Sequence, residues 1–337
     1  MMSTKLFANL AVAVLSLAAL TGGAMAADVS LMVGGIEKQI YLPVALAQQL
    51  GYFRDEGISV DILSEPAGVE AADEMLAGAV QGVIGFYDHT IQLQSLGKFT
   101  ESVVQLGLAP GEVEVVSSRH PEIRSVPDFK GKHVGITGLG SSTDFLTEYL
   151  LVKNGLKLSD ITPVPVGAGD SLIAAMEHDQ IQAAMTTEPT VSRLLTSGEA
   201  RVLVDTRTLD GSAATFGGVY PASCLYMESS WVEAHRDIVQ KLVNALVRTL
   251  HFIEMHDAKT IAALMPHDFY AGDEALYIQA LANGKQMFST DGRMPADGPA
   301  TVLRVLSQIR STLKDKPVDL SRTFDGSFVA AADKLYD

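Results

Sequence analysis

Short apolar runs alternate with amphipathic segments through the first part of the chain. Each apolar run ends at a glycine or a polar residue, which is typical of a buried strand. The segments between them repeat apolar residues at helical spacing. The strands expected from this pattern are 29–33, 58–63, 82–86, 103–108 and 112–116. Regular alternation of strands and helices predicts parallel pairing through right-handed crossovers, and therefore an α/β layered unit.

The same order of elements restarts near Lys132 and predicts a second unit. Residues 117–119 are the expected passage into it, and 217–220 are the expected passage out. The strands expected inside it are 134–137, 161–166, 181–185 and 200–204, and 224–227 is expected to return to the first unit. We therefore predict a signal peptide over 1–26, a discontinuous first lobe over 27–117 plus 221–337, and a second lobe over 118–220. Each lobe is expected to be a mixed sheet flanked by helices.

The turn after the expected strand 134–137 carries the most distinctive chemistry. Gly138 and Gly140 permit a tight turn, and a helix begins directly after it. Three hydroxyl residues stand at that helix start, where free N–H groups and the helix dipole favour an anion. A helix cap accounts for only one of these hydroxyls. The sequence therefore predicts a ligand site formed by Gly140, Ser141, Ser142 and Thr143.

A nucleotide site is the weaker interpretation of this turn. Thr143 replaces the third glycine of the dinucleotide fingerprint, and the chain has no Gly-Lys-Ser/Thr of a P-loop.

Further candidate residues lie in the other loops that follow strands, where open α/β sheets bind their ligands. These candidates are Gly35, Tyr41, Tyr87, Asp88, His89, Gly169 and Glu188. Two interpretations stay open for most of them. His89 either binds an anionic group of the ligand or is hydrogen-bonded by the backbone. Asp88 and Glu188 either bind an amine of the ligand or cap helices, and capping is favoured for Asp88. Tyr41 and Tyr87 either stack on a ring of the ligand or pack in the core.

Composition and charge restrict the function. The chain has 337 residues, 47% of them hydrophobic, which is enough for two domains with their own cores. Its formal net charge of −15 argues against a nucleic-acid partner. Lys5, the apolar segment 6–20 and the small-residue site at 24–26 predict a secretory signal cleaved after Ala26. Gly23 stands where a lipoprotein would carry its modified cysteine, so we expect a periplasmic protein that is not a lipoprotein.

Catalytic and metal-binding patterns are not found. The chain has no Gly-x-Ser-x-Gly, and its single cysteine, Cys224, lies in an apolar run. His251 and His256 are five residues apart and so miss a common helix face. A carboxylate pair of Asp88 and Glu188 stays open, because their separation does not follow from sequence. We expect no catalytic residue, no metal and no cofactor.

Several segments together resemble a known family. They are Gly34-Gly35 followed by 41–43, the segment 47–58 with its glycine–aromatic–acidic–glycine order, 128–135 followed by 140–142, and Glu188-Pro189. In these segments the chain resembles the periplasmic substrate-binding proteins of ABC transporters for sulfonates, nitrate, taurine and thiamine precursors.

The resemblance implies a two-lobe periplasmic-binding-protein fold of type II, hinged by two crossings. It also implies a monomer without enzymatic activity, which binds a small-molecule solute and delivers it to a membrane permease. The helix start at Ser141 favours a small anion as the solute. The alternatives are a pyrimidine or thiamine precursor, a binding protein of a tripartite carrier, and an exported sensor or adaptor that binds a protein.

Overall fold

The computed structural model describes residues 27–336. The predicted signal peptide and its cleavage after Ala26 lie outside these described residues. Within 27–336, no helix combines the length and the apolar character needed to cross a membrane.

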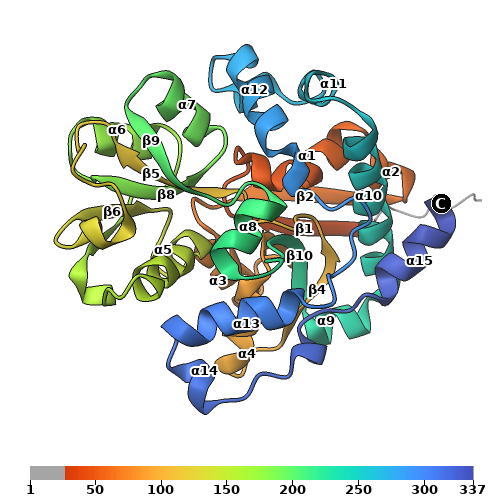
Figure 1. Cartoon of the computed structure of the whole chain (residues 1–337). Helices are drawn as coiled ribbons and strands as arrows, with labels where there is room; N and C mark the ends of the chain where they lie inside the picture. The colour runs from red at the N-terminus through yellow and green to blue at the C-terminus, as the bar shows by residue number, and fades with distance from the viewer. Residues whose placement is uncertain (1–26, 337) are drawn as a thin grey trace, which may run out of the picture.

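Two five-stranded mixed sheets organise the fold, one in each lobe (Figure 1). The first sheet has the order β2-β1-β3-β10-β4, with β1 parallel to β2 and β3, and with β10 antiparallel to β3 and β4. Its strands are β1 (Ala27–Val33), β2 (Ile58–Ser64), β3 (Gly82–Phe86), β4 (Thr100–Gln105) and β10 (Ser223–Glu228). The predicted return of the chain to the first sheet after the second passage is confirmed by β10.

The second sheet repeats this plan in the order β7-β6-β8-β5-β9. Its strands are β5 (Glu112–Ser117), β6 (His133–Ile136), β7 (Thr162–Pro165), β8 (Ala183–Thr187) and β9 (Ala200–Asp205). β6 runs parallel to β7 and β8, whereas β5 runs antiparallel to β8 and β9. In each sheet the fourth strand in this order, β10 or β5, is the first strand that the chain forms after it crosses from the other lobe.

The position of β5 corrects one sequence expectation. Residues 112–116 were expected in the first lobe, with the passage at 117–119, but β5 pairs only with strands of the second sheet. The chain therefore crosses between β4 and β5, over residues 106–111. The physical reason is that the partners of β5 lie far downstream in the sequence, where a local apolar pattern gives no information about pairing.

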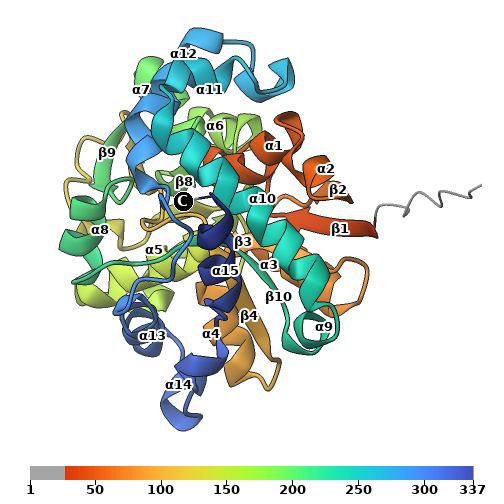
Figure 2. The same cartoon turned by 90° about the vertical axis from the view of Figure 1, so that its right-hand side faces the viewer.

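Helices cover both sheets, and a helical C-terminal part returns to the first lobe. The first lobe contains α1 (Leu42–Gln49), α2 (Tyr52–Asp55), α3 (Gly68–Leu76) and α4 (Asp88–Ser95); the second contains α5 (Ser142–Lys153), α6 (Asp170–Glu177), α7 (Thr190–Thr196) and α8 (Leu209–Phe216). The C-terminal part consists of α9 (Ser229–Ala234), α10 (Arg236–Met255), α11 (Ala258–Ala262), α12 (Glu274–Gly284), α13 (Gly298–Ile309), α14 (Thr312–Asp315) and α15 (Ser327–Tyr336). Short 3-10 helices are η1 (Gln39–Tyr41), η2 (Val126–Phe129), η3 (Leu158–Asp160), η4 (His267–Tyr270), η5 (Lys285–Met287) and η6 (Leu320–Arg322). The long α10 packs on α1, α2 and α15, and it lies in front of the first sheet in the view of Figure 2.

The two lobes are in direct contact. A cluster of buried apolar side chains continues from Tyr87 and Tyr226 of the first lobe to Phe145 on α5 of the second. Gln39 N–H donates to the Glu188 carbonyl oxygen across the lobes at 3.0 Å. The structure therefore shows the lobes closed on one another.

Candidate ligand-binding site

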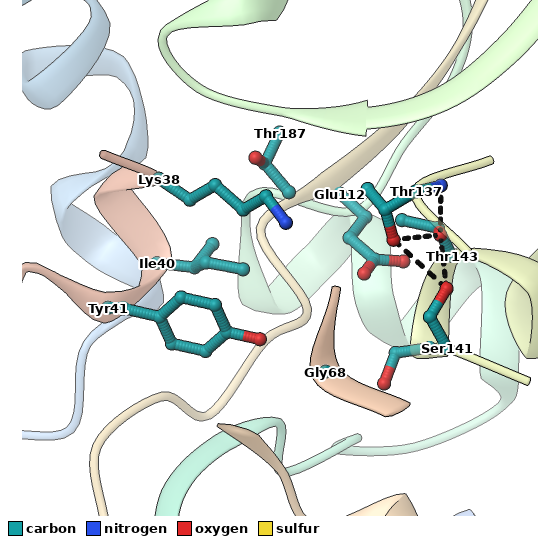
Figure 3. A pocket seen from close by; sticks show the side chains of 10 residues that line it. Lys38, Ile40, Tyr41, Gly68, Glu112, Thr137, Ser141, Thr143 and Thr187 are labelled. Atoms are coloured by element: carbon teal, nitrogen blue, oxygen red, sulfur yellow. Dashed lines mark hydrogen bonds between the residues drawn. The ribbon is translucent and has the colours of Figure 1, made fainter. Parts of the chain in front are cut away.

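A small hollow lies between the lobes, at the ends of strands from both sheets. Figure 3 shows Lys38 and Tyr41 entering it from the first lobe, and Glu112, Thr137 and Ser141 from the second. The residues that line it are Lys38, Ile40, Tyr41, Gly68, Glu112, Thr137, Ser141, Ser142, Thr143 and Thr187. Its volume is about 10 Å³, which is room for about one water molecule. A larger molecule therefore enters only when the lobes separate.

Lys38 supplies the cation of the hollow. Its side chain is buried, and its Nζ donates to the carbonyl oxygens of Gly34 (2.6 Å) and Pro66 (2.8 Å). An ammonium group has three donors, so one remains for a ligand. Burial lowers the pKa of Lys38 to about 8, so most Lys38 side chains stay protonated at pH 7. Gly35, a predicted site residue, shapes this turn through its positive φ of 102° and accepts from Lys38 N–H.

Glu112 supplies a carboxylate from the first position of β5. It is 2% exposed, and its Oε2 has no hydrogen-bond partner among residues 27–336. Burial, followed by the charge of Asp88, raises the pKa of Glu112 well above its usual value, while Lys38 lowers it. Among the described residues no ion pair within 4 Å joins Glu112 to Lys38, so the two groups influence one another across the hollow without contact.

The turn before α5 holds its hydroxyls in a closed network. Ser141 Oγ donates to the Gly138 carbonyl oxygen (2.7 Å), and the side-chain oxygens of Thr137, Ser141 and Thr143 lie 2.8–3.0 Å from one another. Thr137 N–H also donates to Thr143 Oγ1. Each hydroxyl proton therefore has an acceptor inside the turn. Ser141, Ser142 and Thr143 were expected to offer hydroxyl donors to a ligand; in this closed form the hydroxyls of Ser141 and Thr143 instead rigidify the turn.

Ser142 joins the lobes through Asp88. Its Oγ donates to Asp88 Oδ1 at 2.9 Å, and Tyr220 OH donates to Asp88 Oδ2 at 3.1 Å. Burial raises the pKa of Asp88, and its neighbour His89 and these two hydrogen bonds oppose the rise. Asp88, at the first position of α4, thus binds the first turn of α5 and the chain segment that leaves the second lobe.

The backbone amides at the start of α5 remain available. The first hydrogen bond of this helix runs from Phe145 N–H to Ser141 O (3.0 Å), so the N–H groups of the three preceding residues have no acceptor in the helix. No side chain caps this end. Gly140 N–H is occupied, because it donates to Asp144 Oδ2 at 2.8 Å. The helix start therefore has free backbone donors in residues that line the hollow, and the ligand site expected there stays a prediction.

Several predicted residues lie outside the lining. Tyr87 OH is bonded to Thr323 Oγ1 at 2.5 Å, away from the hollow. His89 is buried next to Gly68, which lines the hollow: a Cβ on Gly68 would lie 3.1 Å from His89 Nε2. Gly169 N–H donates to Thr190 Oγ1. Tyr87, His89 and Gly169 are not among the lining residues; of the predicted set, Tyr41, Ser141, Ser142 and Thr143 line the hollow.

Glu188 is fully occupied within its own lobe. Its Oε1 accepts from Arg207 (2.6 Å) and from Ser192 Oγ (3.0 Å), and its Oε2 accepts from Ser192 N–H (2.9 Å). In place of the carboxylate pair that the sequence left open, Asp88 and Glu188 each have their own hydrogen-bond partners.

Sequence reasoning missed Lys38, Glu112 and Thr187. A usable signal was present at β5, where carboxylates alternate with valines in a strand that is buried throughout. Among residues 27–336, no group of three or more His, Cys, Asp or Glu side chains could hold a metal ion.

The architecture defines the class of protein. Structures with the same fold include the alkanesulfonate-binding protein SsuA from Xanthomonas axonopodis pv. citri bound to MOPS (20% identity, TM-score 0.67, covering 92% of this chain and 98% of that one). They also include the nitrate-binding protein NrtA from Synechocystis PCC 6803 (11% identity, TM-score 0.73, covering 93% and 89%). The chain thus has the two-lobe periplasmic-binding-protein fold.

The family follows from two further comparisons. The family described as NMT1/THI5 like matches residues 40–259. A solved protein from Bordetella bronchiseptica RB50 is 36% identical, with a TM-score of 0.89, covering 92% of this chain and 98% of its own. The chain belongs to the NMT1/THI5-like family. No curated protein sequence is significantly similar to it.

Proposed function

We propose that this chain is the periplasmic solute-binding component of an ABC importer, and that its solute is a small anion. The relatives of the same fold named above bind alkanesulfonate and nitrate. The hollow between the lobes, lined from both sheets, is the place for such a solute. A monomer is sufficient for this role, and its partner is the membrane permease that receives the solute.

The observation that carries the anion assignment is the position of Lys38. Its ammonium group enters the hollow opposite the uncapped start of α5 (Figure 3). A helix start contributes about 0.3–2 kcal/mol to binding a negative group, and each hydrogen bond to a charged group contributes about 1.5–3 kcal/mol. One ammonium donor and the backbone amides of α5 are together enough to favour an anion over its neutral analogue.

The same arrangement explains binding by closure. A solute held by Lys38 of the first lobe and by α5 of the second has its full set of contacts only when the lobes are together. It therefore binds the closed form more tightly and shifts the population toward it. The residues of the hollow form none of the nucleophile–base arrangements that turnover requires, so the solute is expected to leave unchanged.

A thermal-shift screen tests the proposal, because ligand stabilisation grows as RT ln(1 + [L]/Kd). Sulfonates, carboxylates, nitrate and bicarbonate are the probes. At least one should raise the melting temperature, and Lys38→Met should abolish that rise. Lys98→Met, which removes an exposed lysine, is the matched control and should leave it intact. A response only to a neutral or cationic pyrimidine would overturn the anion assignment.

A further inference from the structure

Glu112 is a buried carboxyl group with no partner on one of its oxygens. It is 2% exposed, and Oε2 contacts no donor. A buried polar group without a partner is costly, and a buried charge is more so, which is why such groups are rare in folded proteins. The carboxyl group lines the hollow, so its missing partner belongs to the hollow.

Thr187 lies beside Glu112 and shares this feature. The two residues are paired in register across β5 and β8. Thr187 is 1% exposed, lines the hollow, and its hydroxyl has no hydrogen-bond partner. A carboxylate and a hydroxyl that are both free to accept form a corner suited to an N–H donor.

Asp88 does not compete for such a donor. Both of its oxygens already accept, one from Ser142 and one from Tyr220. Among the residues that line the hollow, Glu112 is therefore the one carboxylate and Lys38 the one cation.

We propose that Glu112 and Thr187 form a subsite for a protonated nitrogen, so that the solute is a small zwitterion. Its anionic group lies at Lys38 and the start of α5, and its ammonium group lies at Glu112. This inference rests on the proposed anion-binding function and names the solute class more closely.

Charge balance distinguishes the zwitterion from simpler solutes. A plain anion satisfies Lys38 but leaves Glu112 without a partner and adds a second negative group beside it. A plain cation satisfies Glu112 but is repelled by Lys38. A molecule with one charge of each sign pairs with both groups, which already lie on opposite lobes.

Proton release gives an independent signature. The raised pKa of Glu112 means that its carboxyl group retains a proton to higher pH than usual when no cation is bound. An ammonium group that binds there favours the carboxylate, so the carboxyl proton passes to the buffer. The bound solute itself keeps its protons and forms no covalent bond.

The test is isothermal titration calorimetry of the purified protein with matched probes. The pairs are 2-aminoethanesulfonate with ethanesulfonate, 3-aminopropanoate with propanoate, and 4-(aminomethyl)benzoate with 4-methylbenzoate. Each is titrated between pH 5.5 and 7.5 in bis-Tris and in imidazole, whose ionisation enthalpies differ and which carry no anionic group that would compete at Lys38. For at least one pair, the amino-bearing probe should bind at least about tenfold more tightly, equal to about 1.4 kcal/mol, and should release a proton that its partner does not.

Four variants locate the effect. Glu112→Gln should remove the preference and the proton release, whereas Glu114→Gln should retain both, because Glu114 is also buried with an unpartnered oxygen but does not line the hollow. Thr187→Val should weaken the preference, and Thr186→Val should not. Thr186 is the matched control because its hydroxyl is buried and unpartnered outside the hollow.

The outcomes separate the two proposals. If both members of a pair bind equally, or if the deaminated member binds better, the zwitterion inference is wrong and the anion assignment stands. If no member of any pair binds although another anion raises the melting temperature, the zwitterion inference is wrong and the anion assignment stands; if no anion raises it either, both fail. A preference that survives Glu112→Gln in a folded variant also overturns the inference.

Discussion

Two carboxylates occupy equivalent places in the two lobes and have different partners. Asp88 follows β3 and Glu188 follows β8, and each of these strands is third in the same sheet order. Glu188 forms an ion pair with Arg207 and accepts from Ser192, all inside the second lobe. Asp88 forms no ion pair with any residue that the structure describes, and it accepts from Ser142 of the opposite lobe and from Tyr220.

The difference teaches that topological position does not decide the role of a side chain. Glu188 ties β8 to the loop after β9 and so contributes to the stability of the second lobe. Asp88 holds the lobes together and so contributes to closure. Glu112, with an oxygen free, is the carboxylate left for a ligand.

The largest expected effect is on stability, from Glu188→Gln. This change leaves Arg207 with Asp205 alone in a site where the Arg207 side chain is 12% exposed. Loss of one partner of a buried ion pair costs about 3–5 kcal/mol, and the remaining Asp205 places the expected loss near the lower limit, about 3 kcal/mol. Urea unfolding measures it. Solute affinity should stay within about twofold of wild type, and a stable variant that fails to bind would contradict this assignment.

Asp88→Asn should reduce stability by a smaller amount, and the size of this loss should depend on pH. The amide keeps an acceptor for Ser142 but cannot accept equally from Tyr220, a loss of at most about 2 kcal/mol. Burial raises the pKa of Asp88 in the folded protein, so the stability that Asp88 contributes falls as pH rises from its unfolded pKa to its folded pKa. The deficit of the variant should therefore be larger at pH 4 than at pH 8. The measurement is the free energy of unfolding of wild type and Asp88→Asn at pH 4 and at pH 8. A stability difference between them that is larger at pH 8 would contradict this account.

Gly138→Ala should weaken binding by obstructing closure. A Cβ at Gly138 would lie 2.9 Å from the Cβ of Ala67 in the opposite lobe. We expect about tenfold weaker solute binding, equal to about 1.4 kcal/mol, with an unchanged unfolding midpoint. Gly326→Ala is the control, because a Cβ there meets nothing within 4 Å. Equal affinities of the two variants would show that closure does not need this contact.

The smallest effect is expected from Tyr87→Phe. This change removes the hydrogen bond to Thr323, which should reduce stability by about 1 kcal/mol. Tyr87 does not line the hollow, so calorimetry should detect no change in affinity. A large loss of affinity would restore the sequence prediction that Tyr87 contacts the solute.

Much of the fold could be predicted from the sequence, because apolar runs and turn residues are local signals. The two units, the return of β10 and the helix start after Gly138–Gly140 are all present in the structure. β5 was assigned to the wrong lobe because its partners β8 and β9 follow much later in the chain.

The site was predictable only in part. The turn before α5 was found because glycines and hydroxyls mark it. Lys38 was missed because it lies in no motif, and Glu112 was missed although carboxylates alternate with valines along β5, because that strand was expected in the first lobe. No sequence pattern indicates that Arg207 forms an ion pair with Glu188, or that Ser142 donates to Asp88.

The central claim is tested most directly by a crystal structure of the protein in complex with the probe that raises its melting temperature most. The account predicts that the probe lies between the lobes, with its anionic group in hydrogen-bond distance of Lys38 Nζ and the first amides of α5, and with its nitrogen at Glu112. A probe bound at another surface would contradict it. So would a closed form in which Lys38 and Glu112 contact one another directly and leave the probe outside.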